Sequence, residues 1–168
     1  MEKKDLDWGN IGFSYMPTDK RYVANYKDGA WDEGGMTSDP NVVINECAGI
    51  LQYCQEIFEG LKAYTTEDGS IVTFRPDLNA ERMMDSARRL EMPPFPKERF
   101  LEAVDQVVKA NAAWVPPFGS GATLYLRPYM FATGPVIGVK PSQEYQFRLF
   151  GTPVGPYFKG GAKPLTLC

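Results

Sequence analysis

Arg82 is the first residue whose type and position predict chemistry. It lies in FRPDLNAERM at residues 74–83, where a short β-prone run ends at Pro76 and a helical pattern begins. A strand that leads directly into a helix puts Arg82 near the helix N-terminus, where unpaired N–H groups and the helix dipole attract anions. An ordinary solvated arginine is the alternative, and position alone leaves both interpretations open.

Tyr125 and Arg127 form a second candidate pair in the β-prone run ATLYLRPYMFAT at residues 122–133. Because they are two residues apart, a strand would put them on the same face. An arginine among apolar neighbours is costly unless a carboxylate or other acceptor meets its guanidinium group. Either a structural partner or a ligand must therefore supply that acceptor.

The sequence contains no histidine, which narrows the possible chemistry. Ser-His-Asp and Cys-His catalysis are excluded, as is zinc held by histidine. Any proton transfer must use a lysine, a tyrosine, a carboxylate or a group outside this sequence. Cys47, Cys54 and Cys168 lack metal-type spacing, and their odd number fits reduced thiols in a cytosolic protein.

Composition indicates one soluble domain, and we expect no metal site because the sequence lacks histidine and metal-type cysteine spacing. The chain has 168 residues, of which 43% are hydrophobic, and 18 basic against 21 acidic residues give a net charge of -3. Without a basic cluster, nucleic acid and anionic membranes are not expected partners.

No apolar run approaches the roughly 20 residues of a membrane span, and the charged start lacks a signal-peptide core. We therefore expect a cytoplasmic location.

Two Asp-Gly pairs predict β-hairpins. Asp68-Gly69 separates the β-prone runs 61–64 and 71–75, and Asp28-Gly29 separates the runs 21–26 and 30–32. This dipeptide favours a two-residue type I′ turn. Both pairs are accordingly expected to close antiparallel strands.

Two helical patterns follow the second hairpin. Asp77 or Asn79 is expected to cap the first helix, and the second pattern runs over residues 97–114. Further β-prone runs lie at 11–16 and 145–152. The order predicts an α+β fold, in which helices pack on a mostly antiparallel sheet. We expect residues 1–158 to form this domain and residues 159–168 to form a linker into a further domain.

Five motifs resemble one protein family in order and spacing. They are LQYCQEIFEGLKAY at 51–64, FRPDLNAERM at 74–83, LYLRP at 124–128, GPVIGV at 134–139 and PVGPYF at 153–158. Together they resemble the N-terminal part of a branched-chain amino-acid aminotransferase, a fold-type IV enzyme that uses pyridoxal 5′-phosphate. The resemblance implies a homodimer that moves an amino group from leucine, isoleucine or valine to 2-oxoglutarate, giving glutamate and a branched 2-oxo acid.

The resemblance also implies roles for individual residues. Arg82 matches the arginine that binds the cofactor phosphate. Tyr125 and Arg127 match positions that face the substrate, where the arginine is similar to one that receives the side-chain carboxylate of glutamate. The remaining matches are substrate-pocket positions: Phe13, Phe58 and Tyr157 line the pocket for the branched side chain, and Tyr53 and the loop from Ile137 to Val139 reach the neighbouring subunit's site.

The family's Schiff-base lysine lies in a C-terminal domain that these 168 residues do not match. Lys163 follows Gly160-Gly161-Ala162 and is superficially similar to the lysine motif, but it directly follows PVGPYF, which in the family lies well upstream. Lys62 has the pattern of a solvated strand lysine. We therefore expect no catalytic residue in this chain, no stable cofactor binding and no activity of this polypeptide alone.

Two other functions remain open. The chain is alternatively a non-catalytic ligand-binding or dimerisation module, because it keeps Arg82 and the apolar loop at 134–139. It is also compatible with another fold-type IV enzyme, such as a D-amino-acid aminotransferase or a lyase acting on aminodeoxychorismate. The FEGLKAY, LYLRP and PVGPYF motifs favour the branched-chain group.

Overall fold

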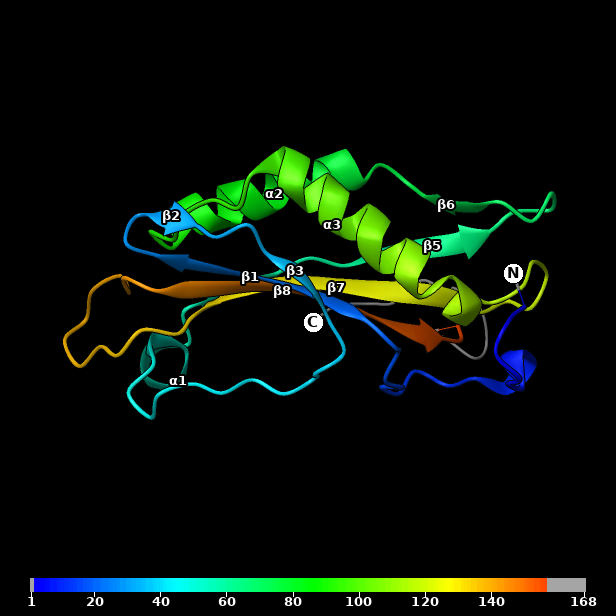
Figure 1. Ribbon diagram of the computed structural model, residues 1–168, viewed down its shortest axis with the longest axis horizontal. Coiled ribbons are helices and arrows are strands. Elements are labelled where there is room, and N and C mark those ends of the chain that lie inside the picture. Colours follow the sequence, from blue (N-terminus) through cyan, green and yellow to red (C-terminus); the bar gives the residue numbers. More distant parts are fainter. Residues whose placement is uncertain (1, 157–168) are drawn as a thin grey trace, which may run out of the picture.

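One antiparallel sheet forms the centre of the computed structural model, which describes residues 2–156 (Figure 1). Its strand order is β2-β1-β8-β7-β5-β6, with β3 paired to β1 and β4 paired to β7. The long pair β7–β8 runs in register from Thr123↔Val154 to Ala132↔Tyr145. The strands are β1 (Arg21–Lys27), β2 (Ala30–Trp31), β3 (Gly35–Thr37), β4 (Glu56–Phe58), β5 (Leu61–Thr65), β6 (Ile71–Thr73), β7 (Thr123–Ala132) and β8 (Tyr145–Val154).

Two helices, α2 (Pro76–Arg89) and α3 (Lys97–Ala110), cover one face of the sheet, and the short α1 (Gly49–Tyr53) lies on the other side (Figure 1). Two 3-10 helices are η1 (Trp8–Asn10) and η2 (Ala112–Trp114). This arrangement confirms the predicted α+β class.

The second predicted helix is shorter than its pattern because Asn111 ends it. The Asn111 side-chain amide donates to the Val107 and Lys20 carbonyl oxygens, both at 2.8 Å, and accepts the Lys20 N–H at 3.0 Å. These bonds tie the end of α3 to the segment before β1.

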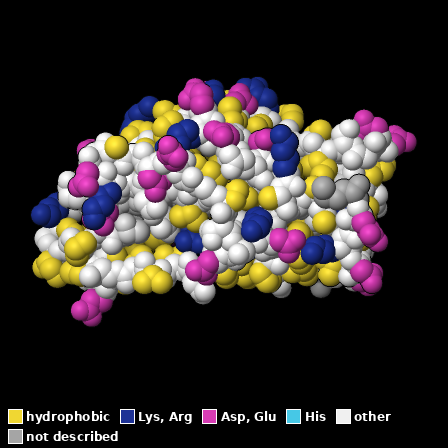
Figure 2. All heavy atoms as spheres, in the orientation of Figure 1, with side chains coloured by type: hydrophobic (Ala, Val, Ile, Leu, Met, Phe, Trp, Pro, Cys, Tyr) yellow, Lys and Arg dark blue, Asp and Glu magenta, His cyan; other side chains and the backbone are white. Residues whose placement is uncertain are grey.

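The core lies between the helices and the sheet. Alternate residues of the long strands point into it, and Phe147 stacks on Phe95 with ring centroids 3.9 Å apart. Each such large side chain contributes roughly 1.5–3 kcal/mol when fully buried. Figure 2 shows charged side chains over the helices and hydrophobic ones along the lower edge of the same view. The main core residues are Met83 and Ala87 of α2, Phe100, Val104 and Val107 of α3, and Leu124, Leu126, Phe147 and Leu149 of the sheet.

The two Asp-Gly turns differ. Asp28 and Gly29 have φ values of 53° and 84°, so the β1–β2 hairpin has the predicted type I′ turn. Asp68 is not among the residues with positive φ, so the type I′ prediction is wrong for the β5–β6 hairpin, although the hairpin forms. There the Asp68 carboxylate accepts hydrogen bonds from Ser70 and from the Thr66 hydroxyl, which stabilise a longer loop.

Two other local predictions are wrong. Residues 11–16 form no strand; the extended segment is held by Gly155 N–H to Gly12 carbonyl at 3.0 Å and Met16 N–H to Thr152 hydroxyl at 2.8 Å. Helix α2 begins at Pro76, after a left-handed Arg75 without side-chain capping. Proline favours this first helical position because its missing N–H needs no partner there. The helix therefore starts before both predicted caps.

Within residues 2–156, no helix is long and apolar enough to cross a bilayer. The predicted linker at 159–168 lies outside the described residues, so the domain boundary stays a prediction.

Candidate functional site

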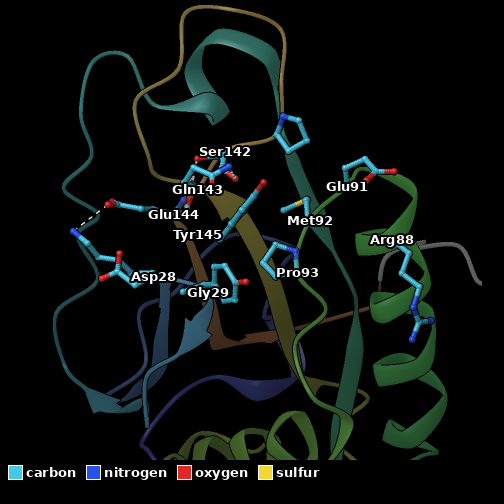
Figure 3. A pocket seen from close by; sticks show the side chains of 13 residues that line it. Asp28, Gly29, Arg88, Glu91, Met92, Pro93, Ser142, Gln143, Glu144 and Tyr145 are labelled. Atoms are coloured by element: carbon cyan, nitrogen blue, oxygen red, sulfur yellow. Dashed lines mark hydrogen bonds and ion pairs between the residues drawn. The ribbon is translucent and has the colours of Figure 1, made fainter.

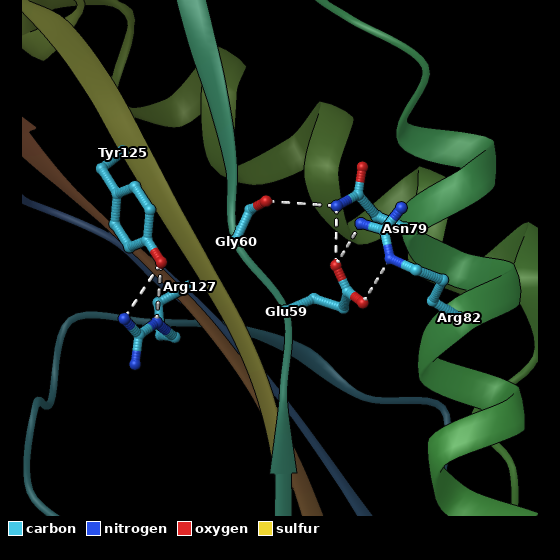
Figure 4. Close-up of polar contacts among 6 residues, drawn as sticks. All are labelled: Glu59, Gly60, Asn79, Arg82, Tyr125 and Arg127. Carbon is cyan, nitrogen blue, oxygen red and sulfur yellow. Dashed lines mark hydrogen bonds and ion pairs between the residues drawn. The ribbon is translucent and has the colours of Figure 1, made fainter. Parts of the chain in front are cut away.

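The segment Phe58-Glu59-Gly60, between β4 and β5, joins the two groups of candidate residues. Figure 4 shows Arg82 of α2 on one side of this segment and Tyr125 and Arg127 of β7 on the other. A Cβ at position 60 would lie 2.5 Å from the Tyr125 hydroxyl oxygen. Glycine is therefore required for the tyrosine ring to pack here.

Arg127 is held by aromatic groups. Its Nε–H and Nη2–H donate to the Tyr125 hydroxyl oxygen at 3.2 and 3.0 Å, and its guanidinium carbon lies 4.3 Å from the Phe58 ring centroid. Among the described residues, no carboxylate forms an ion pair with Arg127. Its structural partner is therefore a neutral hydroxyl, and its positive charge stays available to an anion.

Arg82 is paired with Glu59. Arg82 Nε–H and Nη2–H donate to the two carboxylate oxygens of Glu59 at 3.0 and 2.8 Å, and Asn79 Nδ2–H donates to the same carboxylate at 2.7 Å. Hydrogen bonding to Glu59 raises the pKa of Arg82. The Glu59 side chain is 11% exposed, whereas that of Arg82 is 60% exposed. Because Glu59 takes one edge of the guanidinium group, the Nη1 edge remains for a second anion.

The sequence-based reason for an anion at Arg82 is wrong, because Arg82 lies in the middle of α2 and not in its first turn. The structure offers a different reason. Arg82, Lys62 and Arg75 all line a hollow of about 370 Å³ that also contains Asn79 and Tyr125. Arg75 is paired with Asp77 at 2.7 Å, so Lys62 and the open edge of Arg82 are the cationic groups that fit a phosphate there.

Phe13 and Phe58 extend the Arg127 side of the site. The Phe13 ring centroid lies 6.1 Å from that of Tyr125, and Phe58 lies under Arg127. A hollow of about 190 Å³ lies among Phe13, Tyr125, Arg127 and Phe150. Three aromatic rings around one cation can accept an apolar side chain and a carboxylate in the same space.

Tyr53, Ile137 and Val139 form a separate cluster. The Tyr53 hydroxyl donates to the Ile137 carbonyl oxygen, which joins α1 to the loop after β7. Ile137 and Val139 are 78% and 90% exposed. Tyr125 lies near the start of β7 and this loop follows its end, so the strand separates the two clusters. Tyr157 lies outside the described residues.

A larger hollow, of about 840 Å³, lies away from all these residues (Figure 3). Its walls come from the β1–β2 turn, residues 88–93 and residues 141–145, and Lys27 pairs with Glu144 across 3.0 Å at its edge. It contains none of the predicted site residues. Size alone therefore does not identify the site.

Sequence reasoning missed Glu59, Gly60 and Asn79. Asn79 precedes Arg82 by three residues, so both lie on one helix face, and this spacing was a usable signal. Glu59 and Gly60 stand inside the motif FEGLKAY, in which only Phe58 and Lys62 are interpreted individually from the sequence.

Comparisons with known proteins show which proteins the chain is similar to. No family model matches. The chain is 56% identical to a branched-chain-amino-acid aminotransferase of Haemophilus influenzae over 96% of its own length and 47% of the relative. It is 48% identical to the enzyme of that name from Helicobacter pylori, over 94% of the chain and 46% of the relative. A chloroplastic relative from Arabidopsis thaliana is 46% identical over 99% of the chain and 40% of the relative.

Solved structures of low identity share the fold. A branched-chain aminotransferase from Thermoproteus uzoniensis, solved with norvaline, has a TM-score of 0.66 at 23% identity over 84% of this chain and 43% of that one. The Escherichia coli enzyme gives 0.64 at 22% identity over 83% of this chain and 41% of that one. The chain thus spans less than half the length of the relatives it matches. Over the part that it spans, the chain belongs to the branched-chain-amino-acid aminotransferase family and corresponds to the N-terminal domain.

Proposed function

We propose that this chain is the domain of a branched-chain amino-acid transaminase that binds the substrate side chain and the cofactor phosphate. The reaction moves the amino group of leucine, isoleucine or valine to 2-oxoglutarate. The observation that carries the proposal is the segment Phe58-Glu59-Gly60, which supports Arg127 on one side and Arg82 on the other.

Arg127 is the group we propose for recognition of 2-oxoglutarate and glutamate. Its charge has a hydroxyl partner and a Phe58 face but no carboxylate among residues 2–156, so a substrate carboxylate is its missing counterion. With an aliphatic substrate, Arg127 stays on the Tyr125 hydroxyl. The apolar side chain then packs against Phe13 and Phe58, so one pocket accepts both substrates.

Arg82 is the group we propose for the phosphate of pyridoxal 5′-phosphate. Glu59 and Asn79 fix one edge of its guanidinium group, and the other edge is open to solvent. When bound, the cofactor supplies the electron sink that makes the substrate Cα–H bond acidic. In this scheme the lysine that binds the cofactor covalently comes from a C-terminal domain.

We further propose a homodimer, in which Tyr53, Ile137 and Val139 reach the neighbouring subunit's site. The exposure of two large aliphatic side chains in one loop supports a covered surface. Tyr157 is proposed as a further pocket residue, from the motif PVGPYF alone. We retain the cytoplasmic location as a prediction; Cys47 and Cys54 are free thiols, as it requires.

The proposal is tested by comparing this polypeptide with the longer protein that carries it. The longer protein should form glutamate from leucine and 2-oxoglutarate, whereas residues 1–168 alone should not. Titration of the short polypeptide with pyridoxal 5′-phosphate, followed by borohydride reduction and mass analysis, should give no stoichiometric adduct on one lysine. A specific adduct on Lys163, lost in Lys163→Arg, would contradict the assignment of the catalytic lysine. An inactive longer protein that still binds the cofactor would instead favour a non-catalytic binding module.

A further inference from the structure

A second pair of arginines lies on the face of the sheet opposite α2 and α3. Arg21 of β1 is 4% exposed and Arg148 of β8 is 6% exposed. Val23 lies opposite Arg148, and Arg21 precedes Val23 by two residues, so Arg21 and Arg148 are diagonal neighbours on one face. On the other side of β8, Tyr129 of β7 lies directly opposite Arg148.

The partners of these arginines are neutral. Arg21 Nη2–H donates to the Thr18 carbonyl oxygen at 2.7 Å. Arg148 donates to the Gln146 side-chain oxygen at 3.0 Å and to the Asp39 carbonyl oxygen at 3.1 Å. The buried Arg21 Nε–H has no acceptor in the part of the chain that the structure describes.

Neither arginine forms an ion pair within residues 2–156. The Asp39 carboxylate interacts electrostatically with Arg148 and Arg21, but hydrogen bonds from Asn41 are the main cause of its lowered pKa, and the two arginines contribute less. Residues 157–168 contain no Asp or Glu.

Two buried guanidinium groups whose hydrogen-bond acceptors within residues 2–156 are all neutral are costly. An arginine does not deprotonate in proteins, so the charge cannot be removed, and burial away from water penalises it unless an anion is near. Within the described residues, the two arginines therefore lack a counterion in direct contact.

The space for that anion is a hollow of about 410 Å³ against both arginines. The phenols of Tyr15 and Tyr129 also line it, and burial raises the pKa of Tyr129, so its hydroxyl stays protonated and able to donate. Phe150 forms an apolar wall shared with the smaller hollow at Arg127. Guanidinium and phenol donors facing one space are the groups that bind oxyanions.

We propose that Arg21 and Arg148 form a binding site for a small oxyanion, a carboxylate or a phosphate, next to the proposed substrate pocket and separate from Arg127 and Arg82. The proposal does not depend on the proposed transamination. It assigns the open sheet face a second anion site beside the first, because Arg148 of β8 and Arg127 of β7 lie on directly paired strands.

The test observes the Arg21 Nε–H directly. The 15N-labelled 168-residue chain is titrated with sodium phosphate, and separately with sodium chloride at the same ionic strength; Arg21→Lys assigns the signal. The Arg21 signal should shift and saturate with phosphate and not with chloride. Competition by acetate would identify carboxylates as ligands, and a response to phosphate alone would identify phosphates. An Arg21 signal that responds equally to phosphate and chloride would overturn the proposal.

Variants separate this site from the other cationic ones. Arg148→Leu removes a buried charge without adding a polar group. The phosphate affinity measured from the Arg21 signal should fall at least about tenfold, because one charge-assisted hydrogen bond is lost. Tyr129→Phe deletes only one hydroxyl and should weaken binding less, and it serves if Arg148→Leu does not fold. Arg127→Met is the comparison variant and should weaken binding less than Arg148→Leu, because Arg127 does not line this hollow. If Arg127→Met and Arg148→Leu weaken phosphate binding equally, the ion binds at Arg127, and the proposal is contradicted.

Discussion

The two faces of the central sheet are built from the same strands but differ in what holds their side chains. On β7, Leu124 and Leu126 point to the helices and are fully buried, whereas the alternating residues Tyr125 and Arg127 are only partly buried. The side chains of the covered face make their contacts within the domain. The open face carries aromatic rings and cations whose contacts are incomplete. Packing therefore accounts for the side chains of the covered face, whereas our proposal assigns those of the open face to ligand binding.

The largest effect expected from this comparison is on stability. Phe147 is fully buried on the covered face and stacks on Phe95, so Phe147→Ala should lower the free energy of unfolding by about 3–5 kcal/mol. Phe58→Ala on the open face should change it by less than about 1 kcal/mol, because the exposed ring loses mainly its contact with Arg127. Urea unfolding of both variants measures the difference. Equal losses of unfolding free energy in the two variants would mean that side chains of the two faces contribute equally to stability.

The next largest effect on stability is expected at Gly60, in the segment between β4 and β5. Gly60→Ala puts a methyl group 2.5 Å from the Tyr125 hydroxyl oxygen, so the ring must move, at a cost of about 1–3 kcal/mol. Gly12→Ala is the control, because a Cβ there meets nothing within 4 Å. Thermal unfolding should separate the two variants, and similar melting temperatures would show that Tyr125 moves freely.

A smaller effect concerns two ion pairs of α2. Glu59→Gln removes a largely buried carboxylate that binds Arg82 and Asn79, and we expect a loss of about 1 kcal/mol after allowing for the exposure of Arg82. Asp85→Asn breaks the exposed pair with Arg88 and should have almost no effect. Denaturant midpoints of both variants check this. An equal response would mean that Glu59 does not fix Arg82.

The smallest effect is a pH dependence at the start of α2. The hydrogen bond from Arg75 lowers the pKa of Asp77 from 3.8 to about 2. A carboxyl group whose pKa is depressed on folding stabilises the protein above its unfolded pKa and loses that contribution as pH falls through the folded value. The stability difference between the chain and Asp77→Asn should therefore shrink between about pH 4 and pH 2, as urea unfolding across that range can show. A difference that stays constant over that range would contradict the assignment.

The sequence predicted the covered face better than the open one. Periodicity of two and of 3.6 residues located β7, α2 and α3, because burial repeats with the geometry of each element. The Glu59–Arg82 pair was not predictable, since it joins residues from different elements and no periodicity relates them. The start of α2 was predictable from Pro76, but the capping residues after it were given more weight. At Asp68, hydrogen bonds to the side-chain carboxylate determine the turn type, and the general preference of Asp-Gly for type I′ does not account for such bonds.

The most direct test of the open face as the substrate side is kinetic, in the longer protein. Arg127→Met keeps the length and apolar stem of the side chain and removes the charge, so the KM for 2-oxoglutarate should rise about tenfold or more, whereas the rate with leucine in the first half-reaction should change less than about threefold. Arg89→Met, at an exposed arginine of α2, is the matched control and should leave both values unchanged. If Arg127→Met affects leucine and 2-oxoglutarate equally, Arg127 does not recognise the second carboxylate, and the open face is not the surface that distinguishes the two substrates.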